Sequence, residues 1–493
     1  MAPDTRERRA ALPLKDPSLF KEQCCLDGRW IDADGGARHE VANPATGRTI
    51  GSVPRMGAGE TRRAIEAADK AWPAWRSKTA KERSAVLRKW AELQLANVDD
   101  LALIMTTEQG KPLAEARAEV TIGAAYTEWF AEEAKRVYGD VIPTIGNDRR
   151  LLAIKQPVGV CAAITPWNFP SSMITRKVSP ALAAGCTVVI KPAEATPYSA
   201  LALAVLAERA GFPPGVLNVV VGSAKAIGGE MTANPLVRKL SFTGSTEVGR
   251  LLMQQVAPTI KKLSLELGGN APFIVFDDAD LEEAVAGAIV CKFRNSGQTC
   301  ISANRMLVQD GIYDDFLAAF IEAVSKLVVA DGFTPGVNVG PLIDEPAVGK
   351  VERHVGNAVD GGAELLLGGS RIEGQFFQPS VLVGVSPEMA MSCEETFGPV
   401  AGIARFATEA EAIAVANDTP YGLSAYFFSR DVGRITRVGE ALEYGIVGVN
   451  TGLISTEVAP FGGVKESGIG REGSSFGIDE WVELKYWAIG GVQ

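Results

Sequence analysis

The chain has 493 residues, of which 46% are hydrophobic and 22% are charged, a composition typical of a globular enzyme with two or three domains. The formal net charge is −10, so nucleic-acid binding is not expected. No stretch of the sequence has the roughly 18 uninterrupted apolar residues of a membrane span, so no membrane association is expected.

The seven cysteines argue against both a disulfide framework and a zinc site. Their number is odd, they are scattered, and no pair has the CxxC spacing. They are Cys24, Cys25, Cys161, Cys186, Cys291, Cys300 and Cys393. We therefore expect no metal and a reducing, cytoplasmic location. The first 20 residues mix Arg6, Arg8 and Arg9 with acidic residues and lack an apolar signal core, which predicts a loose arm without a targeting signal.

The order of apolar segments along the chain predicts an α/β fold. Residues 24–57 are typical of short strands and turns, residues 59–137 of helices, and residues 141–154 of strands. Five apolar strands then alternate with helices, at 159–164, 187–190, 216–221, 239–242 and 262–266. Such alternation predicts a parallel sheet covered on both faces.

A second α/β series follows the first. It comprises helix 281–292, strand 305–308, helices 313–328 and 347–360, strand 364–367, and further alternating elements to about residue 450. The segment 481–489 alternates like a strand. It is expected to pair either with the sheet edge of another subunit or within its own subunit.

The stretch Phe293 to Cys300 places a cysteine in a polar, glycine-containing loop directly after a predicted helix. Such a thiol can be a nucleophile, a structural cysteine or a metal ligand. The only histidines, His39 and His354, lie in polar or charged surroundings and are predicted to be surface residues. A nucleophilic Cys300 would therefore use a carboxylate as its base.

Two segments of the first series are suited to a nucleotide, although the GxGxxG fingerprint is missing after its first strand. Gly244 to Gly249 opens a helix after the fourth strand, where backbone amides can bind phosphate, or where Ser245 simply caps the helix. Lys191 to Glu194 ends the second strand, where it forms either a ribose site or a solvated charged turn.

Several motifs, in order and spacing, resemble the aldehyde dehydrogenase superfamily over residues 20–493. They are Thr165 to Pro170, Lys191 to Glu194, Phe242 to Gly249, Leu265 to Asn270, Gly297 to Cys300, Glu394 to Pro399 and Pro460 to Gly463. Longer runs at 240–247, 291–295 and 462–468 are similar to the succinate-semialdehyde dehydrogenase branch. The resemblance implies a Rossmann-type NAD-binding domain, an α/β catalytic domain and a small β oligomerisation arm.

The resemblance also assigns the catalytic roles. It implies that Cys300 attacks the aldehyde, that Asn168 and the Cys300 backbone N–H stabilise the oxyanion, and that Glu266 activates water against the resulting thioester. The alternative is that Asn168 caps a helix and Glu266 is a charge-paired structural residue. A thioester-forming cysteine hydrolase or acyltransferase without a cofactor, and a non-catalytic binding protein, are the other classes considered.

The cofactor residues implied by the resemblance are Trp167, Lys191, Pro192, Ala193, Glu194, Gly244, Ser245, Leu267, Glu395 and Phe397. Glu395 is expected at the nicotinamide ribose. A carboxylate at position 194 can accept hydrogen bonds from both adenosine ribose hydroxyls and would repel a 2′-phosphate by at least ~1 kcal/mol. NAD is therefore expected to be preferred over NADP.

For the substrate, the resemblance implies that Arg176 and Arg294 bind a carboxylate with help from Ser455; the alternative is a structural salt bridge for each arginine. The expected partner is a small semialdehyde with an anionic tail, succinate semialdehyde first. Glutarate semialdehyde, 2-oxoglutarate semialdehyde and a sulfonated short aldehyde are alternatives. Close relatives often carry a second cysteine two residues after the nucleophile; here that residue is Ser302, so no disulfide switch is expected.

The expected domain division follows from the same comparison. Residues 1–140 and 158–272 would form the cofactor domain, with a return at 451–480; residues 273–450 would form the catalytic domain. Residues 141–157 and 481–493 would form the oligomerisation arm, and the protein is expected to be a homodimer or homotetramer.

Overall fold

The computed structural model describes residues 12–492. The predicted loose N-terminal arm falls partly on residues 1–11, which lie outside the described residues. Its second half is not loose. A short 3-10 turn, η2 (Pro17–Leu19), buries Leu19 completely, and Asp16 accepts a hydrogen bond from Arg209 at 2.6 Å. The apolar residues Leu12 and Leu14 pack against the same core, which explains why this half is fixed.

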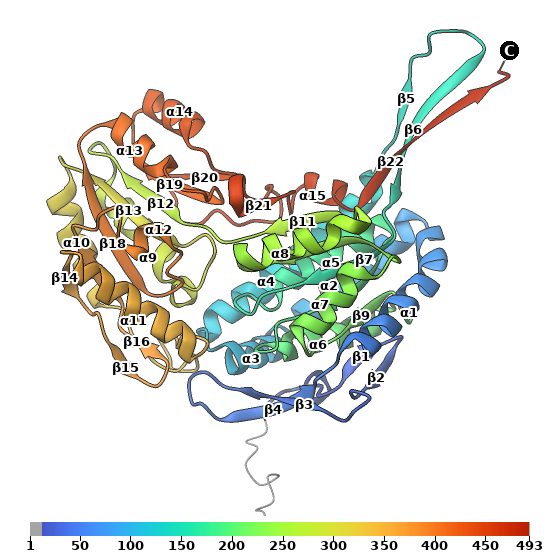
Figure 1. Cartoon of the computed structure of the whole chain (residues 1–493), viewed down its shortest axis with the longest axis horizontal. Helices are drawn as coiled ribbons and strands as arrows, with labels where there is room; N and C mark the ends of the chain where they lie inside the picture. Colours follow the sequence, from blue (N-terminus) through green and yellow to red (C-terminus); the bar gives the residue numbers. More distant parts are fainter. Residues whose placement is uncertain (1–11, 493) are drawn as a thin grey trace, which may run out of the picture.

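Figure 1 shows two α/β units side by side, with a long strand pair projecting from one of them. The first unit contains a six-stranded sheet of order β21-β11-β10-β7-β8-β9. Its strands are β7 (Val160–Ile164), β8 (Thr187–Lys191), β9 (Leu217–Val219), β10 (Val237–Thr243), β11 (Lys262–Glu266) and β21 (Gly468–Ile469). The first five are parallel, as predicted, and only β21 is antiparallel. Because the strand order reverses between β7 and β10, the crevice at their carboxyl ends is where such sheets bind ligands.

Eight helices accompany this sheet within the described residues. They are α1 (Ala58–Ser77), α2 (Ala80–Ala96), α3 (Val98–Gln109), α4 (Leu113–Glu133), α5 (Ser172–Ala184), α6 (Pro197–Ala210), α7 (Ala224–Ala233) and α8 (Thr246–Val256). Local sequence fixes several of their starts. Thr79 and Glu82 form a capping box at α2, and the Ser245 side chain accepts a hydrogen bond from the Val248 amide at α8. The predicted helical cap at Ser245 is thus present.

The second unit contains a seven-stranded sheet of order β14-β17-β18-β13-β12-β19-β20. Its strands are β12 (Ala271–Val275), β13 (Ala303–Gln309), β14 (Glu364–Leu367), β17 (Ser380–Val383), β18 (Val400–Phe406), β19 (Ser424–Phe428) and β20 (Ile446–Val449). Its helices are α9 (Leu281–Phe293), α10 (Tyr313–Ser325), α11 (Glu345–Asp360), α12 (Ala390–Cys393), α13 (Glu409–Asn417) and α14 (Val432–Ala441). The predicted second α/β series is therefore present, with only β14 antiparallel in the sheet.

Smaller elements complete the described chain. They are β1 (Cys24–Leu26), β2 (Arg29–Ile31), β3 (Arg38–Ala42), β4 (Thr49–Pro54), β15 (Arg371–Glu373), β16 (Phe376–Phe377), α15 (Phe476–Asp479), and the 3-10 turns η3 (Ala134–Arg136), η4 (Ala257–Thr259), η5 (Arg294–Gly297) and η6 (Lys465–Ser467). Between residues 12 and 492 no helix is long and apolar enough to cross a membrane.

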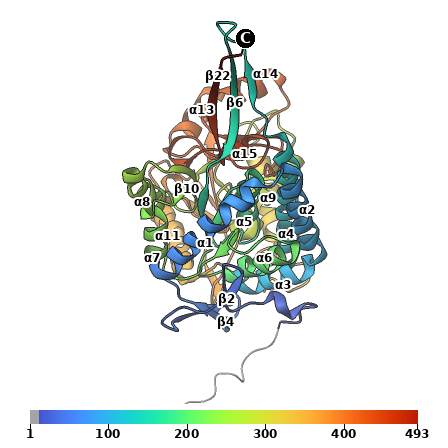
Figure 2. The same cartoon turned by 90° about the vertical axis from the view of Figure 1, so that its right-hand side faces the viewer.

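The chain's last strand, β22 (Val482–Gly490), pairs antiparallel with β6 (Arg149–Pro157) of the same chain. With β5 (Asp140–Ile142) they form a three-stranded arm, which both views show extending away from the body (Figures 1 and 2). Of the two pairings expected for the tail, the structure has the one within its own subunit. The strand β22 is an edge, and Leu484 and Tyr486 on it are 69% and 61% exposed.

Candidate active site

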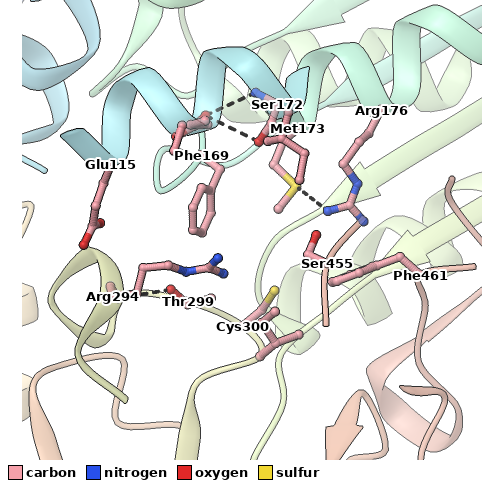
Figure 3. A pocket seen from close by; sticks show the side chains of 14 residues that line it. Glu115, Phe169, Ser172, Met173, Arg176, Arg294, Thr299, Cys300, Ser455 and Phe461 are labelled. Atoms are coloured by element: carbon pink, nitrogen blue, oxygen red, sulfur yellow. Dashed lines mark hydrogen bonds between the residues drawn. The ribbon is translucent and has the colours of Figure 1, made fainter. Parts of the chain in front are cut away.

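A cavity of about 170 Å³ lies where the two units meet, and Cys300 lines it. Figure 3 shows the Cys300 thiol at one wall, with the guanidinium groups of Arg176 and Arg294 approaching from different sides and Ser455 next to Arg176. The predicted nucleophile and all three predicted substrate residues therefore share one cavity. Arg176 comes from α5, Arg294 and Cys300 from the loop after α9, and Ser455 from the segment after β20.

The loop that carries Cys300 has an unusual backbone. Asn295 and Ser296 have φ angles of 51° and 58°, in the left-handed region that side-chain-bearing residues rarely adopt. Such residues cost on the order of 1–3 kcal/mol each. Gly297 follows with φ 73°, and a Cβ there would lie 2.2 Å from the Gly398 carbonyl oxygen. The turn is thus held by its surroundings, and it directs the chain sharply from the helix to Cys300.

The predicted oxyanion residue, Asn168, follows β7 and is 3% exposed. Its Nδ2 donates to the Gln298 carbonyl at 3.0 Å, two residues before Cys300. An amide nitrogen has two protons, so one remains for another acceptor. The structure therefore brings the Asn168 amide to the reactive loop with a spare donor.

The predicted base, Glu266, ends β11 and is 4% exposed. A Cβ placed on Gly462 would lie 3.0 Å from Glu266 Oε1, so the carboxylate lies directly against this glycine, while Oε2 has no hydrogen-bond partner among the described residues. Burial raises the pKa of Glu266 well above its usual range, and the nearby Glu472 carboxylate adds to the effect. A carboxyl group with a raised pKa is suited to accepting a proton from water near neutral pH.

Burial raises the pKa of the Cys300 thiol to about 12, and the negative charge of Glu395 contributes in the same direction. The charges of Arg176 and Arg294 lower this pKa, whereas the charge of Glu266 raises it further. The thiol is thus predominantly protonated, and its reactivity depends on the charges around the cavity.

The two arginines differ in their surroundings. Arg176 is ion-paired with Glu472 at 3.0 Å, and its guanidinium carbon lies 3.9 Å from the centre of the Phe461 ring. Arg294 forms no ion pair with any described residue, and its guanidinium lies 5.6 Å from the Phe169 ring centre. The structural salt bridge considered as an alternative thus exists for Arg176 and is absent for Arg294 within residues 12–492.

The predicted cofactor residues cluster at the carboxyl ends of the six-stranded sheet. The Trp167 and Phe397 rings meet edge to face, with centroids 5.5 Å apart. Lys191 is buried at the end of β8, where burial lowers its pKa and the charge of Glu194 partly offsets that shift. Lys191 and Glu194 follow β8, the neighbour of β7, and so lie at the same carboxyl-end edge of the sheet as the reversal between β7 and β10, where a dinucleotide is expected.

Glu395, another predicted cofactor residue, lies beside Gly268 together with Thr246, which was not among the predicted cofactor residues. A Cβ on Gly268 would lie 3.1 Å from Glu395 Oε2 and 3.4 Å from Thr246 Oγ1. Thr246 Oγ1 and Glu395 Oε1 are buried and have no partner within the described residues. Burial raises the pKa of Glu395 to about 7. Side-chain-free backbone beside unsatisfied polar atoms fits a hydroxyl-rich ligand such as a ribose.

Other residues of the cavity were not predicted from the sequence. Phe169 and Phe461 lie inside motifs that were noted, but a role for their rings was not foreseen. Glu115 in the cavity wall gave no signal, and neither did Glu472, which pairs with Arg176, because each is one acidic residue in a long chain. Among the residues described, no group of three metal-ligating side chains occurs.

His354 was predicted to be a surface residue, and that prediction is wrong. Its side chain is completely buried on α11, where Nδ1 lies 3.1 Å from Thr396 Oγ1 and Nε2 lies 3.2 Å from Glu394 Oε2. It therefore contacts residues on both sides of Glu395. Burial lowers the pKa of this imidazole.

The aldehyde dehydrogenase family model matches residues 30–487, so the chain belongs to the aldehyde dehydrogenase family. It is accordingly an oxidoreductase that acts on aldehydes, with the predicted α/β fold. The match decides against the cofactor-independent hydrolase and the binding protein that the residues had left open.

Relatives in the semialdehyde branch resemble the whole chain. A glutarate-semialdehyde dehydrogenase of Pseudomonas putida KT2440 is 63% identical, over 97% of this chain and 100% of the relative. The NADP(+) succinate-semialdehyde dehydrogenase GabD of Escherichia coli K12 is 62% identical, with the same coverage. A 3-sulfolactaldehyde dehydrogenase of Pseudomonas putida is 58% identical over 98% of this chain and 99% of the relative. The crystal structure of an E. coli NADP-dependent enzyme superposes with a TM-score of 0.96 at 62% identity, over 97% of this chain and 100% of the other.

The expected preference for NAD over NADP is contradicted by these relatives. Both the E. coli succinate-semialdehyde dehydrogenase and the E. coli crystal structure are named for NADP. The physical reason lies at Glu194, which is only partly buried and close enough to Lys191 to interact with its charge. A solvated carboxylate repels a phosphate by only ~1 kcal/mol, which one nearby ammonium offsets.

Proposed function

We propose that this aldehyde dehydrogenase oxidises succinate semialdehyde to succinate, with glutarate semialdehyde as the second candidate. The observation that carries the proposal is the position of Arg294, an arginine without an ion pair in the described chain, in the same cavity as Cys300 and Arg176. Guanidinium groups bind planar carboxylates through paired hydrogen bonds. A short ω-oxo acid held there by its acid end presents its aldehyde end to the thiol.

In this proposal Cys300 is the nucleophile. Its sulfur forms a bond to the aldehyde carbon, and the carbonyl oxygen gains the negative charge of a tetrahedral thiohemiacetal. The spare Nδ2 proton of Asn168 and the backbone N–H of Cys300 would stabilise that charge, and one such donor contributes ~3–4 kcal/mol in the transition state. Support comes from the contact between Asn168 and Gln298, which fixes the amide at the reactive loop.

The nicotinamide dinucleotide would supply the hydride acceptor, so that the thiohemiacetal carbon could lose its hydrogen with the electron pair of the C–H bond and remain on Cys300 as a thioester. Gly244 and Ser245 would hold its phosphates at the start of α8, and Lys191, Pro192, Ala193 and Glu194 the adenosine ribose. Trp167, Leu267, Glu395 and Phe397 would surround the nicotinamide end. The unsatisfied oxygens of Thr246 and Glu395 support this assignment, because they require a polar partner.

Glu266 is proposed as the general base for the second half of the reaction. It would take a proton from water, and the resulting hydroxide would attack the thioester carbon and release the acid from Cys300. Its raised pKa supports the role, since a more basic carboxylate accepts a proton from water more readily.

Two observations keep glutarate semialdehyde as the second candidate. The glutarate-semialdehyde dehydrogenase of P. putida is 63% identical to this chain, and the sulfolactaldehyde relative also has a substrate named for an anionic group. The guanidinium group of Arg294 lies at the end of a long flexible side chain. It can therefore move to accommodate one extra methylene in the substrate. These observations support an anionic tail on the substrate and leave its chain length at four or five carbons.

The domain division and assembly are also proposals. The six-stranded unit would be the cofactor domain and the seven-stranded unit the catalytic domain. The arm of β5, β6 and β22 would mediate a homodimer or homotetramer, which the exposed apolar side chains of the edge strand β22 support.

The deciding experiment is a kcat/KM panel of aldehydes of two to six carbons, with and without a terminal carboxylate, run with NAD and with NADP. We expect the four- or five-carbon ω-oxo acids to exceed uncharged aldehydes of equal length by at least tenfold. A panel in which uncharged aldehydes perform equally well would exclude the carboxylate-binding assignment.

A further inference from the structure

A completely buried ion pair lies behind the candidate oxyanion residue. It joins Lys111, in the turn between α3 and α4, to Glu119 on α4, and their side chains are 1% and 2% exposed. In the sequence, Lys111 lies between Gly110 and Pro112, two residues that are typical of a break between helices. Burying two charges costs free energy unless their remaining donors and acceptors are also satisfied. The groups that bond to these remaining donors and acceptors therefore indicate the role of the ion pair.

Both partners bond to the segment that begins at Asn168. Lys111 Nζ donates to the Asn168 carbonyl oxygen at 2.7 Å. Glu119 Oε1 accepts from the backbone amides of Ser171 and Ser172, at 2.9 and 3.1 Å. One ion pair thus holds the chain at Asn168 and again at the first turn of α5, which fixes the backbone between them.

The same segment is bonded to the reactive loop on its other side. Asn295 Nδ2 donates to the Asn168 carbonyl at 2.9 Å, the acceptor that Lys111 also uses. Asn168 in turn donates to the Gln298 carbonyl at 3.0 Å. An unbroken hydrogen-bonded chain therefore leads from Lys111 through Asn168 to the loop that ends at Cys300.

The turn that carries Lys111 is closely packed against the second unit. A Cβ on Gly332 would lie 2.4 Å from the Lys111 carbonyl oxygen, and one on Gly340 would lie 2.3 Å from the Gly110 carbonyl oxygen. Gly340 also accepts a hydrogen bond from Ser296 in the reactive loop, at 2.9 Å. The lysine and the reactive loop are thus both fixed to the same segment, so their relative position is strongly constrained.

We propose that Lys111 is a positioning residue for the oxyanion site, whose buried ammonium holds Asn168 so that its amide faces the oxygen that gains charge. The proposal rests on the proposed function of Asn168 and Cys300. Lys111 itself contacts neither substrate nor cofactor in this account. Its removal takes one of two hydrogen-bond donors from the Asn168 carbonyl, leaving only Asn295, and it leaves Glu119 buried without a counter-ion. Small displacements of a catalytic group cost about 100-fold in rate, which is the effect expected here.

The test uses two reactions of Cys300 that need neither a semialdehyde nor a nicotinamide. Acylation by p-nitrophenyl acetate passes through an oxyanion: sulfur bonds to the acetyl carbon and p-nitrophenolate leaves with the electron pair. Alkylation by iodoacetamide displaces iodide and forms no oxyanion. Loss of positioning should therefore slow the first reaction and spare the second.

The variants are chosen so that folding defects can be recognised. Lys111→Met removes the ammonium, and Lys111→Met with Glu119→Gln avoids a lone buried carboxylate while keeping an acceptor for the Ser171 and Ser172 amides. Lys111→Arg restores the charge. Lys239→Met is the matched control, because Lys239 is equally buried and ion-paired, with Glu480 at 3.2 Å, and contacts neither Asn168 nor the reactive loop in the described structure.

We expect ester acylation to fall by 10- to 100-fold in both Lys111→Met variants, with alkylation within threefold of the wild-type rate and partial rescue in Lys111→Arg. Lys239→Met should leave the acylation and alkylation rates within threefold of the wild type, even if its melting temperature falls as far as that of Lys111→Met. Equal loss of acylation and alkylation, an unchanged acylation rate in the double variant, or the same loss in Lys239→Met would overturn the proposal. Ester hydrolysis that persists in Cys300→Ala would overturn the nucleophile assignment itself, and this proposal with it.

Discussion

Arg176 and Glu472 form an ion pair of 3.0 Å in which the side chains are only 3% and 8% exposed. Arg176 is therefore held by a buried carboxylate, which it shares with Lys177. Arg294, on the opposite side of the cavity, has no such partner among the described residues. The two arginines thus differ in what they can offer to an anionic substrate, and Arg294 should carry more of the selectivity.

Replacing Arg294 with alanine should raise KM for succinate semialdehyde by roughly 10- to 150-fold, because hydrogen bonds to a charged group contribute ~1.5–3 kcal/mol. The KM for butanal, which has the same chain length and no carboxylate, should change less than threefold. Initial-rate kinetics on both aldehydes at one ionic strength measure the difference.

Two further variants serve as controls for this prediction. Arg294→Lys keeps the charge but loses the planar pair of donors, so it should lie between alanine and the wild type. Arg176→Ala removes a buried cation from the cavity wall and leaves Glu472 paired with Lys177 alone, so it should lower the melting temperature and impair both aldehydes. A proportionate loss on both aldehydes in Arg294→Ala would contradict the carboxylate-binding role.

Replacing Glu266 with glutamine should lower steady-state turnover by about 10²- to 10⁴-fold, the usual contribution of a general base. The first turnover should still produce a burst of reduced cofactor, because the thioester forms but is not hydrolysed. Stopped-flow absorbance separates the burst from the steady state.

The raised pKa of Glu266 also predicts the direction in which the deacylation rate changes with pH. A base with a raised pKa is protonated and inactive below that pKa, so wild-type deacylation should rise with pH. Burial is the main cause of the shift and Glu472 the second, so Glu472→Gln should move the rise to lower pH. If Glu266→Gln turned over at the wild-type steady-state rate, another group would have to be the base.

How much the sequence could predict depended on the range of the interactions involved. The parallel strands β7 to β11 were predictable because their burial is expressed locally, as continuous apolar runs between helices. The ion pair Arg176–Glu472 was not, because no local pattern tells which residues far apart in the chain become partners. Lys111 and Glu119 are only eight residues apart, but a turn precedes the helix that carries Glu119, so helical spacing does not relate them.

His354 and Glu194 show two ways in which prediction failed. Val348, Val351, His354 and Val355 recur at helical spacing and are all buried on α11, so the periodicity did contain the signal. The charged neighbours of the histidine obscured it. For Glu194 the prediction rested on hydrogen bonds from the ribose hydroxyls and on a repulsion of a 2′-phosphate of at least ~1 kcal/mol. It left out Lys191, whose charge lies close enough to offset a repulsion of that size.

Peroxide should not form a disulfide within the reactive loop of the wild type, because Ser302 stands two residues after Cys300. Peptide mapping should find oxygen added at Cys300 instead. In Ser302→Cys a linked peptide should appear, lighter by two hydrogen atoms and restored by dithiothreitol.

Cys291 is the control for this experiment, since its sulfur lies 3.7 Å from the Ile301 carbonyl oxygen, next to Cys300 in sequence. Cys291→Ser should leave the wild-type pattern unchanged. A reducible peptide linking Cys291 to Cys300 in the wild type would show that the loop has a redox partner after all.

Alkylation of Cys300 by iodoacetamide, in the absence of cofactor, should rise about tenfold per pH unit between pH 7 and pH 10. Only the thiolate reacts, and with a pKa of about 12 its fraction is roughly one in ten thousand at pH 8. The charges around the thiol predict the direction of each variant. Glu395→Gln removes a negative charge that raises the pKa, so it should speed alkylation at fixed pH, whereas Arg176→Ala should slow it. Mass spectrometry of the modified peptide, with Cys300→Ser as the blank, gives the rates. A flat profile from pH 7 upward would place the thiol pKa below 7, and the cavity would then have to stabilise the thiolate rather than oppose it.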